Sequence, residues 1–164
     1  MMQYITQNLA AVQAELAAAL GDNAKDCRML AAVKYAAPGE IEALLDAGIR
    51  DVGENRVQQL LENAPIYATR DVRVHFIGTL QTNKVKYIAD KVDMIHSLDS
   101  EKLAKEIEKR AAACGRVIDV LVEINVAREP AKTGVMPEDA EALCRAALAC
   151  PHLHLCGFMT MGPV

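Results

Sequence analysis

Residues 29–55, MLAAVKYAAPGEIEALLDAGIRDVGEN, contain two short apolar runs separated by a helix-like stretch. The runs lie at residues 29–33 and 49–52, and between them Pro38 opens a segment that closes at Gly48. Proline is favoured in the first turn of a helix, and glycine directly after the last turn. The stretch therefore predicts a strand, a helix and a second strand.

The same alternation continues to the end of the chain. Further apolar runs lie at residues 72–77, 92–95, 117–124 and 153–159, again separated by helix-like segments, and an amphipathic helix precedes the first run. The runs are mostly continuous rather than alternating, which is typical of a parallel sheet covered on both faces. The pattern predicts an α/β fold, either a TIM-type (β/α) barrel with about six of its eight βα units or an open six-stranded sheet.

Length and composition place the chain among ordinary globular proteins. With 164 residues and 52% apolar composition, residues 1–164 are expected to form a single domain. The 18 basic and 22 acidic residues are dispersed, so a nucleic-acid partner is not expected. No signal peptide and no membrane-spanning run is evident, which predicts a cytoplasmic protein.

The five cysteines show neither a CxxC pair nor histidines at metal-binding spacing. An odd number of cysteines in such a sequence indicates free thiols in a reducing compartment, and we expect them to be buried. The sequence therefore predicts no metal ligand.

Polar residues follow the predicted strands, where the loops of a parallel α/β fold carry its chemistry. Lys34 directly follows the first apolar run, and apolar neighbours would favour the neutral amine that forms Schiff bases with aldehydes. The alternative is a lysine whose stem packs on the protein while its ammonium reaches water. The position of Lys34 alone leaves both interpretations open.

The other strand ends are equally ambiguous. Asn55 follows Gly53-Glu54 and is either a turn residue or a hydrogen-bond donor to a ligand. His75 lies in an apolar run and His96 ends the next one, and histidines in such runs are more often structural than catalytic. Residues 78–84, GTLQTNK, enter a predicted helix at 84–89 and offer a weak anion-binding signal.

Taken together, these segments resemble the pyridoxal phosphate homeostasis proteins, the YggS/PROSC family, whose fold is similar to the N-terminal barrel of alanine racemase. The resemblance runs from the first helix to the last residue. The most specific match is the ten-residue string HFIGTLQTNK at 75–84. The other matching segments are LAAVK (30–34), DAG (46–48), GENRVQ (53–58), HSLD (96–99), the loop at 125–134 and GFMT (157–160).

The resemblance implies a cofactor and its site. It implies that Lys34 binds pyridoxal 5'-phosphate as a Schiff base and that Asn55 and His75 lie near the cofactor. Met159, in the last matching segment, is assigned to the same site. The departures from the family pattern are Val74 before His75, Lys34 directly after Val33, and the absence of two further strands that carry the phosphate contacts, so we expect a barrel truncated at its C-terminal end.

The implied function is intracellular pyridoxal phosphate homeostasis without turnover, with no catalytic residue and with pyridoxal phosphate-dependent apoenzymes as partners. The complete family fold is monomeric, and an open barrel edge would permit association. Two alternatives remain open at this point. One is a pyridoxal phosphate-dependent racemase or decarboxylase, and the other is a cofactor-free aldolase that uses Lys34 on a carbonyl substrate.

Overall fold

The computed structural model describes residues 2–21, 23, 27–130 and 132–162 and contains a six-stranded sheet. Every neighbouring pair of strands is parallel, and the strands lie in sequence order, as the βα repeat predicted. The strands are β1 (Ala31–Ala32), β2 (Asp51–Glu54), β3 (Arg73–Phe76), β4 (Met94–Leu98), β5 (Ile118–Glu123) and β6 (Leu153–Met159).

Helices connect the strands close to where the sequence places them. The α-helices are α1 (Gln3–Leu20), α2 (Pro38–Asp46), α3 (Val57–Tyr67), α4 (Glu101–Cys114) and α5 (Ala140–Leu148). Helix α4 begins and ends as predicted, because the Ser100 hydroxyl accepts from the Leu103 amide and Gly115 takes the left-handed conformation. The helix predicted at 84–89 is instead the short 3₁₀ helix η2 (Thr82–Tyr87), and a second one, η3 (Pro137–Asp139), precedes α5.

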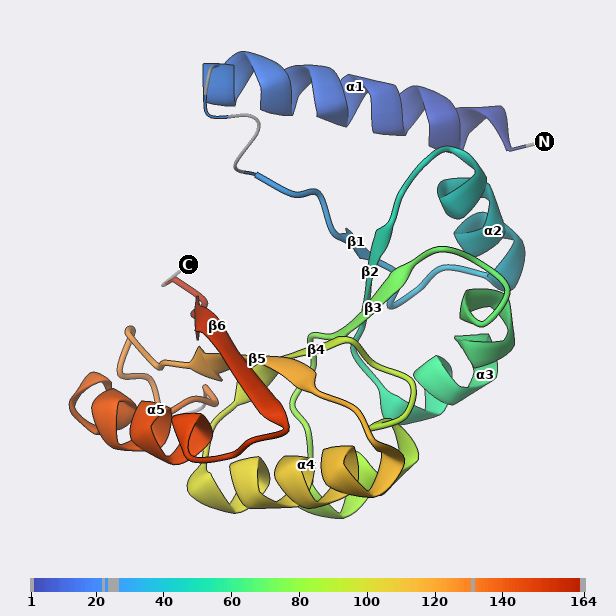
Figure 1. Ribbon diagram of the computed structural model, residues 1–164. Helices are drawn as coiled ribbons and strands as arrows, with labels where there is room; N and C mark the ends of the chain where they lie inside the picture. The colour runs from blue at the N-terminus through green and yellow to red at the C-terminus, as the bar shows by residue number, and fades with distance from the viewer. Residues whose placement is uncertain (1, 22, 24–26, 131, 163–164) are drawn as a thin grey trace.

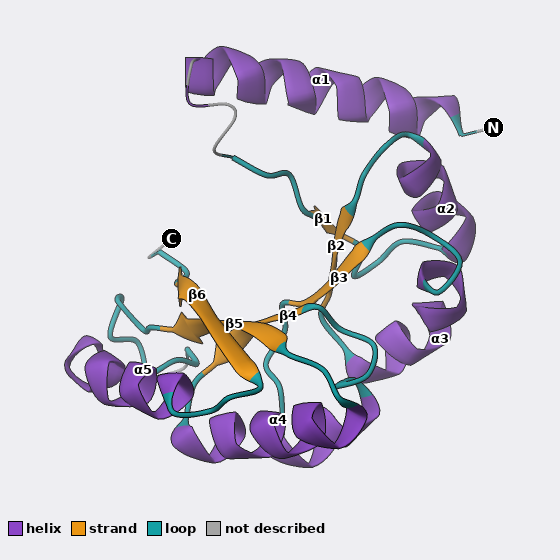
Figure 2. Cartoon of the chain, in the orientation of Figure 1, coloured by secondary structure: helices purple, strands orange, loops and turns teal. Residues whose placement is uncertain are grey.

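Helices α2 to α5 follow one side of the curved sheet, and α1 lies beyond α2 (Figure 1). Figure 2 shows the strands as an arc whose other side carries no helix. The hydrophobic core lies between the strands and this helical layer and includes the fully buried Val52, Phe76, Ile95 and Val120. This is the arrangement of βα units in a TIM-type barrel.

The concave side of the arc corrects one expectation. The apolar runs predicted a sheet covered on both faces and an apolar interior, but strands β2 to β6 place polar side chains on the side away from the helices. Hydrogen bonds between strands join Asp51 to His75, His75 to His96, Arg73 to Asp119, and Asp119 to His154. In these pairings the polar side chains hydrogen-bond one another across the strands. The inner face of the sheet can therefore hold polar residues although the sequence of each strand is mostly apolar.

The cysteines also depart from expectation. Cys27, Cys114 and Cys156 are exposed, and Cys144 and Cys150 are only partly buried. Cys27 lies in the irregular segment before β1, Cys114 ends α4, and Cys156 lies on the concave side of β6, so none of these three points into the core. In the described part of the chain, every helix is too short or too polar to cross a bilayer.

Candidate functional site

Lys34 is held at the carboxyl end of β1 by the residue before it. The Val33 amide donates to the Gly53 carbonyl at 3.0 Å, and the Gln59 side chain donates to the Val33 carbonyl at 3.1 Å. The Val33 side chain is buried toward the helices. Lys34 begins the turn that follows β1, which the Ala36 amide closes by donating to the Val33 carbonyl at 3.0 Å.

The ammonium of Lys34 makes no ion pair with any described residue. Its Nζ lies 4.9 Å from the centroid of the Tyr35 ring, and Tyr35 is 84% exposed. Hydrogen bonding and charge attraction from Lys34 lower the pKa of the Tyr35 phenol. Lys34 is therefore partly buried, with the exposed Tyr35 ring on one side of its ammonium.

Asn55 follows β2 directly and is fixed by a close backbone contact. A Cβ atom at Gly78 would lie only 2.1 Å from the Asn55 carbonyl oxygen, so only glycine permits the loop after β3 to approach this closely. Asn55 is partly buried, and the neighbouring Glu54 is fully buried in β2. Glu54 is thus the last residue of β2, and Asn55 is the first residue of the loop that follows.

Glu54 faces the helices rather than the concave side. Its Oε1 accepts hydrogen bonds from the Asn63 amide at 2.8 Å and from the Tyr67 hydroxyl at 2.6 Å. Burial, together with the Glu54 carboxylate, raises the pKa of Tyr67, so its hydroxyl stays a donor. Glu54 therefore anchors α3 to β2 beneath Asn55.

His75 belongs to a chain of three polar side chains on the concave face. Its Nε2 lies 2.9 Å from Asp51 Oδ1, and its Nδ1 lies 2.9 Å from His96 Nε2. A carboxylate only accepts, so the bonding assigns the His75 proton to Nε2, and His75 Nδ1 accepts from His96. Burial, with a smaller contribution from His75, lowers the pKa of His96 to about 4, in agreement with a neutral His96 donor.

Three of the four predicted site residues belong to neighbouring strands or to the residues directly after them: Lys34 after β1, Asn55 after β2 and His75 in β3. Gly53 pairs with Ala32 on β1 and with His75 on β3, so Lys34 and Asn55 each lie two residues beyond the level of His75. His75 is therefore one layer beneath the strand ends, at about 6.6 Å along the strands. Sequence reasoning named His75 and His96 separately but missed Asp51, whose position at the start of a strand gave no sign of a partner 24 residues away.

Met159 lies elsewhere. It pairs with Glu123 at the end of β6, and β6 is at the opposite edge of the described sheet from β1. The strands do not bring Met159 next to Lys34, and its place in the site stays a prediction. Close to Met159 in register, Glu123 accepts a 2.5 Å hydrogen bond from the Thr133 hydroxyl, and burial raises the pKa of the Glu123 carboxyl.

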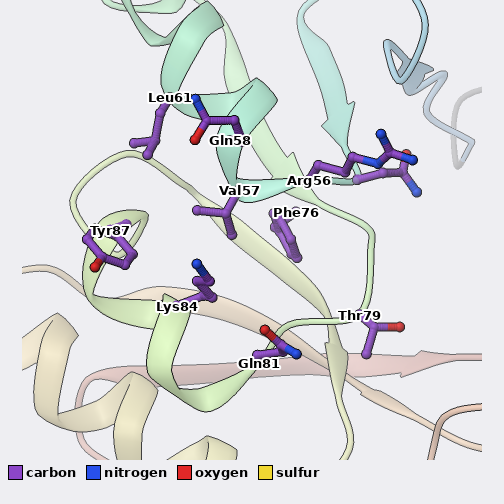
Figure 3. Close-up of a pocket in the computed structure, with 10 residues that line it drawn as sticks. Arg56, Val57, Gln58, Leu61, Phe76, Thr79, Gln81, Lys84 and Tyr87 are labelled. Carbon is purple, nitrogen blue, oxygen red and sulfur yellow. The ribbon is translucent and has the colours of Figure 1, made fainter.

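A pocket of about 590 Å³ opens beside Asn55, between the start of α3 and η2 (Figure 3). Lys84 of η2 points into it, and Phe76 forms part of its wall. Thr79 and Gln81 also line the pocket, so the segment with the weak anion signal does contribute polar groups to a hollow. Lys34, His75 and Met159 are not part of its lining.

The sequence profile of the alanine racemase N-terminal domain family matches residues 4–164, so the fold is that of this class. Two pyridoxal phosphate homeostasis proteins are similar along most of the chain. The one from Aquifex aeolicus is 44% identical over 136 residues, covering 83% of this chain and 60% of its own length. The one from Pseudomonas aeruginosa is 34% identical over 163 residues, covering 98% of this chain and 71% of its own length. The chain therefore belongs to the alanine racemase N-terminal domain family and, within it, to the pyridoxal phosphate homeostasis proteins.

Solved structures agree with this placement. A protein of unknown function from Bifidobacterium adolescentis superimposes with a TM-score of 0.88 at 34% identity, over 98% of this chain and 70% of that one. PipY of Synechococcus elongatus, solved with PLP bound, gives 0.84 at 27% identity, over 98% and 71%. Alanine racemase of Clostridium difficile, at 18% identity and a TM-score of 0.69, shares the fold.

The chain spans about 60 to 71% of the length of these homeostasis proteins. The part of the chain that the family profile matches contains all six described strands and the segment that carries Lys34.

Proposed function

We propose that this protein binds pyridoxal 5'-phosphate covalently through Lys34 and holds it for delivery, without catalytic turnover. The observation that carries the proposal is the position of a partly buried lysine, without an ion pair among the described residues, just beyond the carboxyl end of β1 and one strand from Asn55. Membership of the pyridoxal phosphate homeostasis proteins and the PLP-bound structure of PipY support it.

The residues around Lys34 fit an aldehyde with an aromatic ring. The neutral amine attacks the aldehyde carbon, and one water molecule leaves as the Schiff base forms. Below Lys34, the missing side chain of Gly53 lets Leu30 and Ile77 close over β2, since a Cβ there would lie 2.6 Å and 2.8 Å from their methyl carbons. This apolar floor, with Asn55 directly after the neighbouring strand β2, suits a flat ring with polar substituents.

The fixed state of His75 supports a holding role rather than turnover. Both ring nitrogens of His75 are engaged, one by Asp51 and the other by His96. A general base needs a free nitrogen within reach of the proton that it removes. His75 is therefore suited to position the site and not to transfer protons at it.

Loading the purified protein with pyridoxal phosphate tests the covalent step. We expect a visible absorption band and, after borohydride reduction, a mass increase that maps to the peptide containing Lys34. Lys34→Ala is expected to lose both, whereas Lys84→Ala, which removes the lysine of the neighbouring pocket, keeps both. A reduced adduct on Lys84 or on other lysines, with none on Lys34, would contradict the assignment.

Two further measurements address the role. Loaded protein is expected to restore activity to a pyridoxal phosphate-dependent apoenzyme, as a cytoplasmic carrier would. Lys34→Ala protein that has gone through the same loading and desalting is expected to leave the apoenzyme inactive. Loaded protein is also expected to leave amino acids neither racemised nor decarboxylated above the level of free pyridoxal phosphate. Turnover that exceeds this level and depends on Lys34 would show an enzyme instead of a carrier.

A further inference from the structure

Three side chains that the proposed function does not use meet on the concave face of the sheet, where β5 and β6 lie side by side (Figure 2). His154 and Cys156 are two residues apart on β6, so they point to the same face. Asp119 on β5 is the register partner of His154. Together the three residues offer one carboxylate oxygen, one imidazole nitrogen and one sulfur, all within 4.8 Å of one another.

The contacts converge on a single nitrogen. His154 Nδ1 lies 2.9 Å from Asp119 Oδ1 and 3.3 Å from Cys156 Sγ. A nucleophilic Cys-His-Asp arrangement uses the two different ring nitrogens, one for the thiol and the other for the carboxylate. Here both groups approach the same nitrogen, so the three ligand atoms lie close enough together to contact one ion placed between them.

The two distances from His154 Nδ1, 2.9 Å to Asp119 Oδ1 and 3.3 Å to Cys156 Sγ, are close to those between zinc ligands. Bonds of about 2.0 to 2.2 Å to nitrogen and oxygen and about 2.3 Å to sulfur, at tetrahedral angles, separate ligand atoms by roughly 3.3 to 3.6 Å. The Oδ1 to Nδ1 distance therefore needs to widen by only a few tenths of an ångström. His154 is largely exposed, so its side chain can make this adjustment and an ion can enter from the open side of the sheet.

A second interaction orients the carboxylate. Arg73 on β3 donates from Nη2 to Asp119 Oδ2 at 2.8 Å, which leaves Oδ1 facing His154 and Cys156. Carboxylates that bind metals are commonly held in this way through their other oxygen. A divalent ion, the Cys156 thiolate and the Asp119 carboxylate together carry no net charge. With the Arg73 guanidinium, the occupied site therefore has a net charge of about +1.

We propose that Asp119, His154 and Cys156 form a site for a zinc ion with three protein ligands, the fourth position being open to water. On binding, the Cys156 thiol gives up its proton to solvent, and the proton on His154 Nδ1 moves to Nε2 by exchange with solvent, so that the ion takes the place that this proton held between His154 and Asp119. Three nitrogen, oxygen and sulfur ligands with one open position are typical of zinc sites at which water or another small ligand exchanges.

Titration of the purified protein with Co²⁺ and with Zn²⁺ tests the site. We expect one Co²⁺ per chain with a thiolate-to-cobalt charge-transfer band that Zn²⁺ abolishes by displacement. Cys156→Ser is expected to lose the band, and His154→Gln and Asp119→Asn to weaken Zn²⁺ binding by more than the roughly tenfold loss expected for Arg73→Gln. Circular dichroism checks that each variant is folded.

Matched controls separate this site from other thiols and from the proposed cofactor site. Cys27→Ser and Cys114→Ser remove the other exposed thiols and are expected to leave the band and the affinity unchanged. Lys34→Ala is expected to keep Zn²⁺ binding even though it abolishes pyridoxal phosphate binding. The proposal is overturned if no charge-transfer band appears, if the band survives in Cys156→Ser, or if Zn²⁺ binds Asp119→Asn and His154→Gln as tightly as the original chain.

Discussion

His75 Nδ1 lies 2.9 Å from His96 Nε2, and the two rings meet edge to face with 5.1 Å between their centroids. Asp51 holds the other nitrogen of His75, so the proton positions along the whole chain follow from one carboxylate. The three residues come from β2, β3 and β4 and lie beneath Lys34 and Asn55. This relationship fixes a polar layer one level below the ends of the strands that carry the proposed cofactor site.

The tautomer of His75 is the first prediction. Nitrogen-15 NMR of the imidazoles is expected to show a proton on His75 Nε2, because Asp51 accepts there. Asp51→Ala removes this acceptor, and the signal should then shift toward a mixture of both tautomers. A His75 that carries its proton on Nδ1 in the original chain would contradict the assignment.

The second prediction concerns stability and pH. His96 has a pKa of about 4 in the folded protein because of burial and the nearby His75, against about 6.5 when unfolded. Between these values the unfolded chain binds more protons at this residue, so the free energy of unfolding should rise with pH from 4 to 6.5 and then level off. His96 is only partly buried, so its share is on the order of 2 kcal/mol.

Urea unfolding of the original chain and of His96→Gln at several pH values measures this share. The difference between the two free energies of unfolding should change across pH 4 to 6.5 and stay constant above pH 7. A difference that is the same at every pH would show that His96 does not contribute to the pH dependence.

The third prediction concerns the contact between the loops after β2 and β3. Gly78→Ala would place a methyl group 2.1 Å from the Asn55 carbonyl oxygen, so the loop must move. We expect a loss of about 1 to 3 kcal/mol in unfolding free energy, with a weaker affinity for pyridoxal phosphate because Asn55 shifts. Gly39→Ala in α2 is the matched control, since its new methyl would meet only Met2 Cε at 3.4 Å, and its stability should be unchanged or higher. Equal effects of the two substitutions would rule out the proposed contact.

The fourth prediction concerns the attachment of α3. Tyr67→Phe removes a 2.6 Å hydrogen bond to the buried Glu54 carboxyl, whose Oε2 already lacks a partner among the described residues. Leaving a buried carboxyl with fewer donors should lower the free energy of unfolding by about 1 to 3 kcal/mol. Tyr87→Phe removes a hydroxyl that makes no hydrogen bond to the described residues and should change stability by less than about 0.5 kcal/mol. Thermal unfolding followed by circular dichroism compares the two, and a larger loss for Tyr87→Phe would contradict this account.

The sequence by itself determined the order of the βα units, the location of every strand to within a few residues, and the strand-end lysine. These features are local, because apolar runs, capping residues and turn glycines act over a few positions. The resemblance carried by residues 75–84 gave the family. The short strand β1 and the 3₁₀ form of η2 differ from the prediction because pairing and packing, not propensity, set where an element ends.

Only the tertiary structure decided which side chains meet. Arg73 and Asp119 are 46 residues apart, and Asp119 and His154 are 35 apart, so no local pattern connects them. Their contact depends on the register of parallel strands, which the crossover helices and the packed core set together. The strand order places Met159 and Lys34 at opposite edges of the described sheet. The register of β5 and β6 gathers Asp119, His154 and Cys156 on one face, where the spacing of cysteines and histidines along the sequence predicted no ligand set.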